Sequence, residues 1–169
     1  MPHLDAAYRF ARWLARSGAD ADDIVQEALL RAYRGFDALR GSDIKPWLLT
    51  IVRNCHATAH RSQQRHPSVP LPEDNEANEG YAMAANEPGP ESAAIERDAA
   101  RNLERLLSGL SQEHREVLAL RELEELSYRE IADMTSVPIG TVMSRLARAR
   151  SALRELWLQD CAGELRGVR

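Results

Sequence analysis

Four polar side chains in the last third of the chain are spaced so that they could bind nucleic acid together. Thr141 precedes Ser144 and Arg145 by three and four residues, and Arg148 follows them by four and three, so Thr141 and Arg148 are both neighbours of the central pair on the helix surface. Arginine can contact guanine or a phosphate, and serine and threonine hydroxyls can hydrogen-bond to either. No acidic residue occurs in residues 134–154, so this face is positive and is typical of a helix that enters the major groove of DNA.

A second stretch without acidic residues, 44–72, carries further groups that can bind phosphates or bases: Lys45, Arg53, Asn54, His56, His60, Arg61 and Arg65. The chain has 169 residues and a net charge of −4, but residues 71–100 hold eight of the acids and a single arginine. Binding to DNA depends on local positive faces more than on total charge. The sequence therefore predicts two DNA-binding faces separated by an acidic segment.

The elements predicted around the first of these faces form a helix-turn-helix. Ser127 and Glu130 have the S-x-x-E spacing of a capping box, so a short helix is expected over residues 127–134. After a three-residue turn, a longer basic helix is expected from Pro138 to about Leu156. An ordinary helical hairpin with a solvated face is the alternative, but the uniformly positive charge favours DNA. The turn contains Ser136 where glycine would be easier, and a left-handed serine would cost about 1 kcal/mol or more.

Three helices are predicted in residues 1–65. The first covers Leu4–Ser17, the second has Asp20 as its N-cap, and the third covers Pro46–Gln64. Apolar residues recur at helical spacing along the second helix, and its opposite face is polar apart from one leucine: Asp23, Gln26, Glu27, Leu30 and Arg31. No run of alternating β-branched residues occurs, so we expect an all-α fold.

Composition divides the chain into two small helical domains and a linker. Residues 66–95 hold most of the prolines and many acids, a composition that resists a packed core and predicts a flexible linker. We therefore expect one domain at 1–65 and a second at 96–169. Domains of this size bury modest cores, so a partner that adds buried surface is expected.

Several classes of function are not supported by the sequence. It contains no glycine-rich phosphate loop, nucleophile elbow or pair of carboxylates on an apolar background, so neither catalysis nor a cofactor is expected. No apolar run approaches the ~20 residues that span a membrane, and arginines interrupt the first helix where a secretory signal would be apolar. Two cysteines do not make a disulfide framework. We expect a cytoplasmic protein with reduced thiols.

Taken in order, the motifs resemble those of the extracytoplasmic-function (ECF) sigma factors, a group of the bacterial sigma-70 family. DIVQEALLRAY at 23–33 resembles the helix that binds core polymerase, and PWLLTIVRN at 46–54 resembles the segment that melts and reads the minus-ten promoter element. Six short segments of the last third resemble the domain that reads the minus-thirty-five element: LS at 110–111, REVL at 115–118, YREIA at 128–132, GTV at 140–142, SRL at 144–146 and RAR at 148–150. Met143 and Ala147 depart from the family, which often has a basic and a larger side chain there.

The resemblance implies a transcription initiation factor that binds core RNA polymerase, directs it to promoter DNA and helps to melt the minus-ten element. The polar face of the second helix would bind the clamp helices of the beta-prime subunit, and the beta flap would be a second polymerase contact. The loop at 37–45 and Asn54 would hold a flipped base of the non-template strand, while Arg53, His56, His60 and Arg61 would follow its phosphates. An anti-sigma factor would clamp both domains and hide their DNA faces.

Two other functions fit parts of the sequence. A sigma-like mimic that titrates an anti-sigma factor would lose the basic recognition helix, which this chain keeps. A metal-sensing helix-turn-helix regulator could use His56 and His60, which are four residues apart, as a ligand pair. Zinc sites need three or four ligands, and Cys55 is expected on the apolar side of its helix, so no metal site is predicted.

Overall fold

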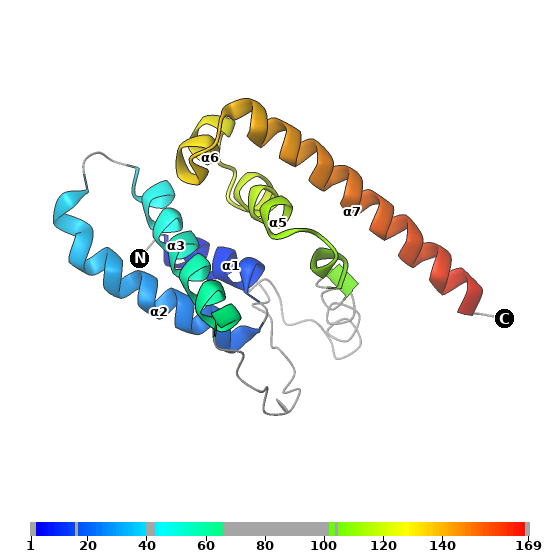
Figure 1. The fold of residues 1–169 in the computed structure, drawn as a ribbon, viewed down its shortest axis with the longest axis horizontal. Coiled ribbons are helices and arrows are strands. Elements are labelled where there is room, and N and C mark those ends of the chain that lie inside the picture. Colours follow the sequence, from blue (N-terminus) through cyan, green and yellow to red (C-terminus); the bar gives the residue numbers. More distant parts are fainter. Residues whose placement is uncertain (1–2, 16, 40–42, 66–101, 104, 168–169) are drawn as a thin grey trace, which may run out of the picture.

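The computed structural model describes residues 3–15, 17–39, 43–65, 102–103 and 105–167, and the regular structure in these ranges is helical (Figure 1). The N-terminal half, residues 3–65, contains α1 (Leu4–Leu14), α2 (Gly18–Gly35), a 3-10 turn (Phe36–Ala38) and α3 (Ile44–Arg65). The C-terminal half, residues 105–167, contains α5 (Gln112–Leu118), a π-helical turn η2 (Ala119–Leu123), α6 (Tyr128–Thr135) and α7 (Ile139–Gly167). The all-α prediction is confirmed.

The three helices of the N-terminal half surround a small apolar core. Phe10 of α1 and Leu49 and Val52 of α3 are completely buried. Small side chains, which let helices approach closely, line the rest of the core on α1 and α2: Ala7, Ala11, Ala21 and Ala28. Because the apolar positions follow the helical repeat, one face of each helix packs into this core, and the opposite face of α2 is exposed to solvent.

The start of α2 differs from the sequence prediction, which placed the N-cap at Asp20. Ser17 is the N-cap instead: its hydroxyl accepts a hydrogen bond from the Asp20 N–H at 3.1 Å. A cap needs extended backbone, which Ser17 has, so α1 ends at Leu14 and does not reach Ser17 as predicted.

The caps predicted for α5 and α6 are confirmed, and α7 begins at Ile139, one residue after the predicted Pro138. Ser111 caps α5 by accepting from the His114 N–H. Ser127 and Glu130 make both hydrogen bonds of the capping box, at 3.2 and 2.7 Å. The recognition helix α7 is longer than predicted and continues past Leu156 to Gly167, since its last turns contain no proline to end it.

The two halves lie against each other and are not separate bodies (Figure 1). α1 contacts both α5 and η2, and α3 contacts α6. Buried residues of both halves belong to one hydrophobic cluster, which includes Phe10 of α1 and Val117 of α5. Across the ranges that the structure describes, no helix combines the length and the apolar character needed to cross a membrane.

Candidate nucleic-acid interface

The helix-turn-helix is closed by short-range contacts between α6 and α7. The Val137 N–H donates to the Ala132 carbonyl at 3.2 Å, which fixes the turn between the two helices. Ile131 of α6 and Val142 and Leu146 of α7 are buried. These buried positions determine which face of α7 points to solvent.

That outward face is a stripe of four exposed side chains at the start of α7, which we call the readout stripe: Met143, Ser144, Ala147 and Arg148. Ser144 and Arg148 belonged to the predicted DNA-binding set, and Thr141 of that set is half-buried. Met143 is 52% exposed and adds an apolar side chain to the stripe. Residue type alone did not select Met143 and Ala147, because neither side chain can donate or accept a strong hydrogen bond.

Arg145, also predicted to bind DNA, lies outside the readout stripe. Its guanidinium is 2.9 Å from the carboxylate of Glu113 on α5, and its side chain is only 21% exposed. This ion pair ties α7 to α5. Arg145 therefore differs from Arg148, which is exposed at the C-terminal end of the stripe.

The predicted DNA contacts on α3 are divided between two environments. Asn54 and Arg61 are exposed, and Arg61 Nε donates to the Ala57 carbonyl at 3.0 Å. His60 is half-buried, with its ring centroid 6.1 Å from that of His56. Asn54, expected to hold a flipped base, and Arg61, expected to follow the phosphates, are seven residues apart and therefore lie on the same face of α3.

Arg53 and His56 face the C-terminal half instead. Arg53 Nε donates to the carboxylate of Glu116 on α5, and its side chain is 29% exposed. Gln112 Nε2 lies 3.3 Å from His56 Nδ1. In this arrangement the C-terminal half contacts both side chains, which the sequence analysis predicted to bind DNA.

Burial controls the protonation of the groups at this contact. Burial, with help from the neighbouring charges of His60 and Arg115, lowers the pKa of His56. Burial also raises the pKa of Glu116, although the guanidinium of Arg53 opposes that shift. A neutral His56 can accept a hydrogen bond at Nδ1 from Gln112, but it cannot serve as a cation for a phosphate.

These histidines do not form a metal centre in the part of the chain that the structure describes. Cys55 is buried, and His56 is directed toward Gln112. Among the described residues, no group of three or more His, Cys, Asp or Glu side chains is arranged to hold a metal ion.

The face of α2 that was predicted to bind polymerase is exposed throughout: Asp23, Gln26, Glu27, Leu30 and Arg31. Arg31 Nε donates to Glu27 at 2.6 Å, one turn away. Leu30 is 54% exposed, and two aromatic side chains that the prediction did not include continue the apolar surface, Tyr33 at 86% and Phe36 at 56%. Phe36 also makes an edge contact with Trp47 of α3, at 6.4 Å between ring centroids.

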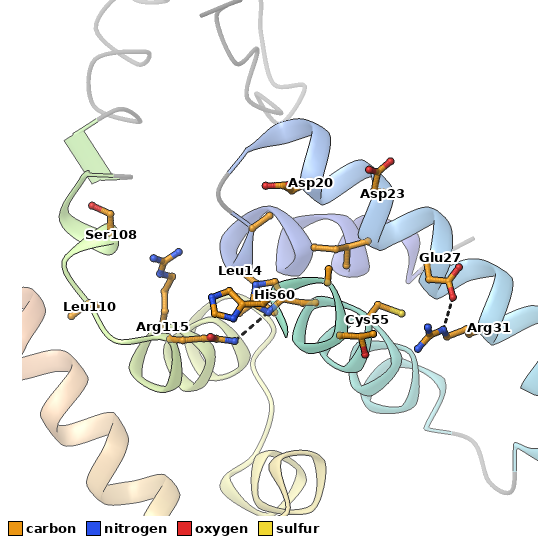
Figure 2. Close-up of a pocket in the computed structure, with 16 residues that line it drawn as sticks. Leu14, Asp20, Asp23, Glu27, Arg31, Cys55, His60, Ser108, Leu110 and Arg115 are labelled. Carbon is orange, nitrogen blue, oxygen red and sulfur yellow. Dashed lines mark hydrogen bonds and ion pairs between the residues drawn. The ribbon is translucent and has the colours of Figure 1, made fainter. Parts of the chain in front are cut away.

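A pocket of about 530 Å³ lies between α2, α3 and the first turns of the C-terminal half (Figure 2). α2 lines one wall with Asp20, Asp23, Glu27 and Arg31, and the wall formed by α3 and α5 carries His56, His60 and Arg115. Leu14, Ile24 and Leu110 supply apolar lining. The pocket therefore suits a segment that has both apolar and charged side chains.

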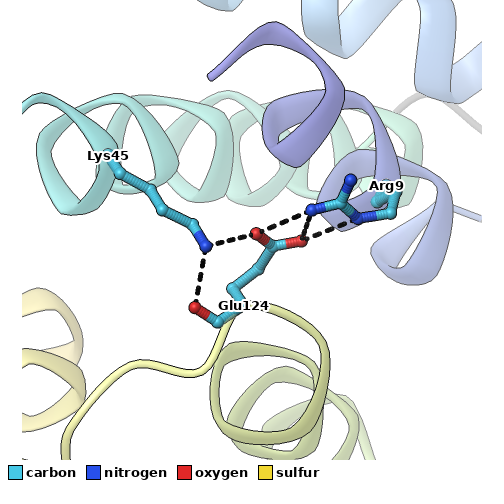
Figure 3. A network of polar contacts seen from close by, with 3 residues as sticks. All are labelled: Arg9, Lys45 and Glu124. Carbon is cyan, nitrogen blue, oxygen red and sulfur yellow. Dashed lines mark hydrogen bonds and ion pairs between the residues drawn. The ribbon is translucent and has the colours of Figure 1, made fainter. Parts of the chain in front are cut away.

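A buried carboxylate joins the two halves near the first turn of α3, which carries Lys45 (Figure 3). Glu124, directly after η2, has a fully buried side chain. Arg9 donates to it through Nε and Nη2, each at 3.2 Å, and Lys45 Nζ lies 2.9 Å from Oε2 and donates to the backbone carbonyl at 2.8 Å. The sequence held no signal for this cluster, since Glu124 is 115 and 79 residues from its partners along the chain.

Comparison with protein families matches both halves of the chain. Residues 1–66 match "Sigma-70 region 2" and residues 100–153 match "Sigma-70, region 4". The ECF RNA polymerase sigma-E factor of Escherichia coli is 36% identical over 138 residues, which are 79% of this chain and 72% of that protein. ECF RNA polymerase sigma factor SigE of Mycolicibacterium smegmatis is 32% identical over 153 residues, and the match spans 58% of its length.

Solved structures with the same architecture agree with this result. The sigma factor RpoE of Bartonella quintana, determined in complex with the anti-sigma factor NepR, is 29% identical with a TM-score of 0.71, and the match covers 92% of each chain. CnrH, determined in complex with the cytosolic domain of CnrY, is 24% identical with a TM-score of 0.65 over 94% of this chain and 84% of that one, a likeness of fold.

Proposed function

The chain belongs to the ECF sigma factors of the sigma-70 family, and from that membership we propose that it binds core RNA polymerase and directs it to specific promoters. The observation that carries the proposal is the helix-turn-helix, whose second helix presents Ser144 and Arg148 to solvent in a segment without acidic residues. RNA synthesis belongs to the polymerase, so we assign the chain no catalytic residue and no cofactor. The proposed place of action is the cytoplasm, where polymerase and promoter meet.

We assign one promoter element to each half. Residues 96–169 would read the minus-thirty-five element through the readout stripe, and residues 1–65 would bind and help to melt the minus-ten element. Asn54 and Arg61 are exposed for that contact. Arg53 and His56 become available only if the C-terminal half moves away, because they now face Glu116 and Gln112. The linker proposed at 66–95 lies outside the described residues.

The exposed face of α2 is the proposed site for the beta-prime clamp helices, with the beta flap as a second contact. Changing Gln26→Ala together with Leu30→Ala should weaken binding of the chain to core polymerase about tenfold or more, because an exposed leucine among charges contributes apolar burial at an interface. Affinity would be measured by fluorescence anisotropy with labelled chain and purified core enzyme.

Asp5→Ala on α1 is the control, since this side chain is also exposed but lies outside the proposed contact. Equal affinity of the Gln26/Leu30 variant and the wild type would remove α2 from the polymerase interface.

An anti-sigma factor is the proposed regulatory partner. Support comes from the Bartonella quintana relative, which was solved with one, and from the pocket between the two halves, whose mixed lining suits an amphipathic segment. Affinity purification of the tagged chain from its native host tests this. Recovery of an additional small protein is expected, and recovery of polymerase subunits alone would count against it.

The central experiment is transcription in vitro with core polymerase and a library of promoter sequences. The chain should select templates that share two elements, and core polymerase alone should not. Absence of any selected sequence would overturn the proposed function.

A further inference from the structure

Two acidic side chains of the C-terminal half form ion pairs with basic side chains in the acid-free stretch 44–72 of the N-terminal half. Lys45 and Arg53 both belong to the acid-free residues 44–72. In the structure Lys45 is bound by Glu124, and Arg53 is bound by Glu116. Both glutamates come from the C-terminal half, and neither cation is more than 29% exposed.

The geometry around Glu124 resembles the way proteins bind a phosphate. A guanidinium from Arg9 and an ammonium from Lys45 converge on two carboxylate oxygens within 3.2 Å (Figure 3). Carboxylate and phosphate are recognised by the same charged donors, so one can replace the other at such a site. Glu124 therefore holds the Lys45 ammonium as a DNA phosphate could, with Arg9 as the second partner of the carboxylate.

The backbone presents Glu124 to this site in a defined conformation. The Glu124 N–H donates to the Ala119 carbonyl at 3.1 Å, and the Leu126 N–H donates to the Leu120 carbonyl at 3.0 Å, which fixes the turn after η2. Glu125, between them, has a positive φ of 56°, a conformation that non-glycine residues rarely adopt. The tertiary contacts of its neighbours hold this turn in place.

The packing of the halves is also incompatible with a two-part promoter. Elements centred near minus ten and minus thirty-five are separated by about 25 base pairs, which is roughly 85 Å of B-form DNA at about 3.4 Å per base pair. In the structure, by contrast, α3 of the N-terminal half contacts α6 of the helix-turn-helix. The two halves must separate before both elements can be bound.

We propose that Glu116 and Glu124 form a carboxylate latch that holds the chain closed and competes with promoter DNA for Arg53 and Lys45. This inference rests on the proposed function, because it concerns when the minus-ten surface becomes available. The closed chain covers that surface with its own C-terminal half, and opening the latch frees both cations for phosphates. Core polymerase, which would bind the halves through separate contacts, would favour the open state.

The latch can be tested on the full chain by neutralising its acids. Glu116→Gln with Glu124→Gln should open the chain, raise the radius of gyration measured by small-angle X-ray scattering, and tighten binding of a fluorescein-labelled, mixed-sequence 15-nucleotide single strand by about threefold or more. Two freed cations should also steepen the slope of log affinity against log salt by about 1.4.

Two further variants separate the latch from a simple change of charge. Glu125→Gln with Asp133→Asn removes the same two charges from exposed positions of the same half, and should leave the radius of gyration unchanged. Arg9→Gln weakens the latch from the other side without removing a proposed DNA contact. It should open the chain and tighten DNA binding although a positive charge is lost, an outcome that charge alone cannot produce.

The proposal fails if the latch variants keep the wild-type radius of gyration, or if their gain in affinity only equals that of the exposed control. Scattering needs neither polymerase nor promoter, so this failure is separate from failure of the proposed function. A wild-type chain that directs transcription while its latch variants stay closed overturns the latch alone. A chain that opens as expected but directs no transcription overturns the promoter role.

Discussion

At the scale of single residues, the proposed recognition of DNA uses the four side chains of the readout stripe, and these differ in chemistry. Arg148 and Ser144 can hydrogen-bond to base edges or phosphates, whereas Met143 and Ala147 offer only apolar contact. The thymine methyl group is the apolar feature of the major groove. We therefore expect the promoter element to be read partly by hydrogen bonds and partly by methyl contacts.

Two substitutions in the stripe should change the binding of minus-thirty-five duplexes in different ways. Arg148→Ala should weaken binding at one base-pair position by about 1–3 kcal/mol. Met143→Ala should reduce the preference for thymine at a neighbouring position, and replacing thymine there by uracil, which lacks the methyl group, should have the same effect on the wild type. Competition binding with substituted minus-thirty-five duplexes measures both. A uracil substitution that affects wild type and Met143→Ala equally at every position contradicts the methyl contact.

At the scale of elements, the turn between α6 and α7 lowers the stability of the helix-turn-helix. Ser136 ends α6 with φ 56° and ψ 40°, a left-handed conformation that costs about 1–2 kcal/mol for a residue with a Cβ. The sequence indicated this position because glycine is the usual residue at such a helix end. The capping box of α6 offsets part of the cost at the opposite end of the same helix.

Ser136→Gly should therefore stabilise the chain by about 0.5–1 kcal/mol, since relief of the left-handed strain exceeds the backbone entropy that glycine loses on folding. Ser151→Gly is the matched control: Ser151 is exposed in the middle of α7, and the same change there should destabilise by about 0.5 kcal/mol. Urea denaturation followed by circular dichroism gives both free energies of unfolding. Destabilisation by Ser136→Gly would contradict the strain.

At the scale of the whole molecule, the contact between the halves is polar as well as apolar and therefore responds to solution conditions. Arg9, Lys45 and Arg53 pair with acids across it, Trp13 Nε1 donates to the Arg115 carbonyl at 2.8 Å, and His56 faces Gln112. Removing charged groups from water offsets much of their mutual attraction. Such a contact can hold a closed state and still be opened by a partner.

His56 should make the stability of the closed chain depend on pH. Because its pKa is lower in the folded chain than in the unfolded one, the unfolded chain binds more protons as the pH falls below about 6.5, and the free energy of unfolding decreases. His56→Gln should reduce this decrease between pH 7 and pH 5, as measured by urea denaturation at each pH. His3→Gln removes one histidine away from the contact and should leave the decrease intact; equal curves for wild type and His56→Gln would contradict the prediction.

The sequence by itself determined what depends on neighbours along the chain. Caps at Ser111 and Ser127, the exposed face of α2 and the basic helix after Pro138 all follow from spacings of three and four residues, which fix local hydrogen bonds and helix faces. Only the tertiary structure decided that Arg53 and His56 face the C-terminal half and that Glu124 is buried between Arg9 and Lys45. Contacts over 56 to 115 residues depend on how two halves dock, and no local pattern encodes that geometry.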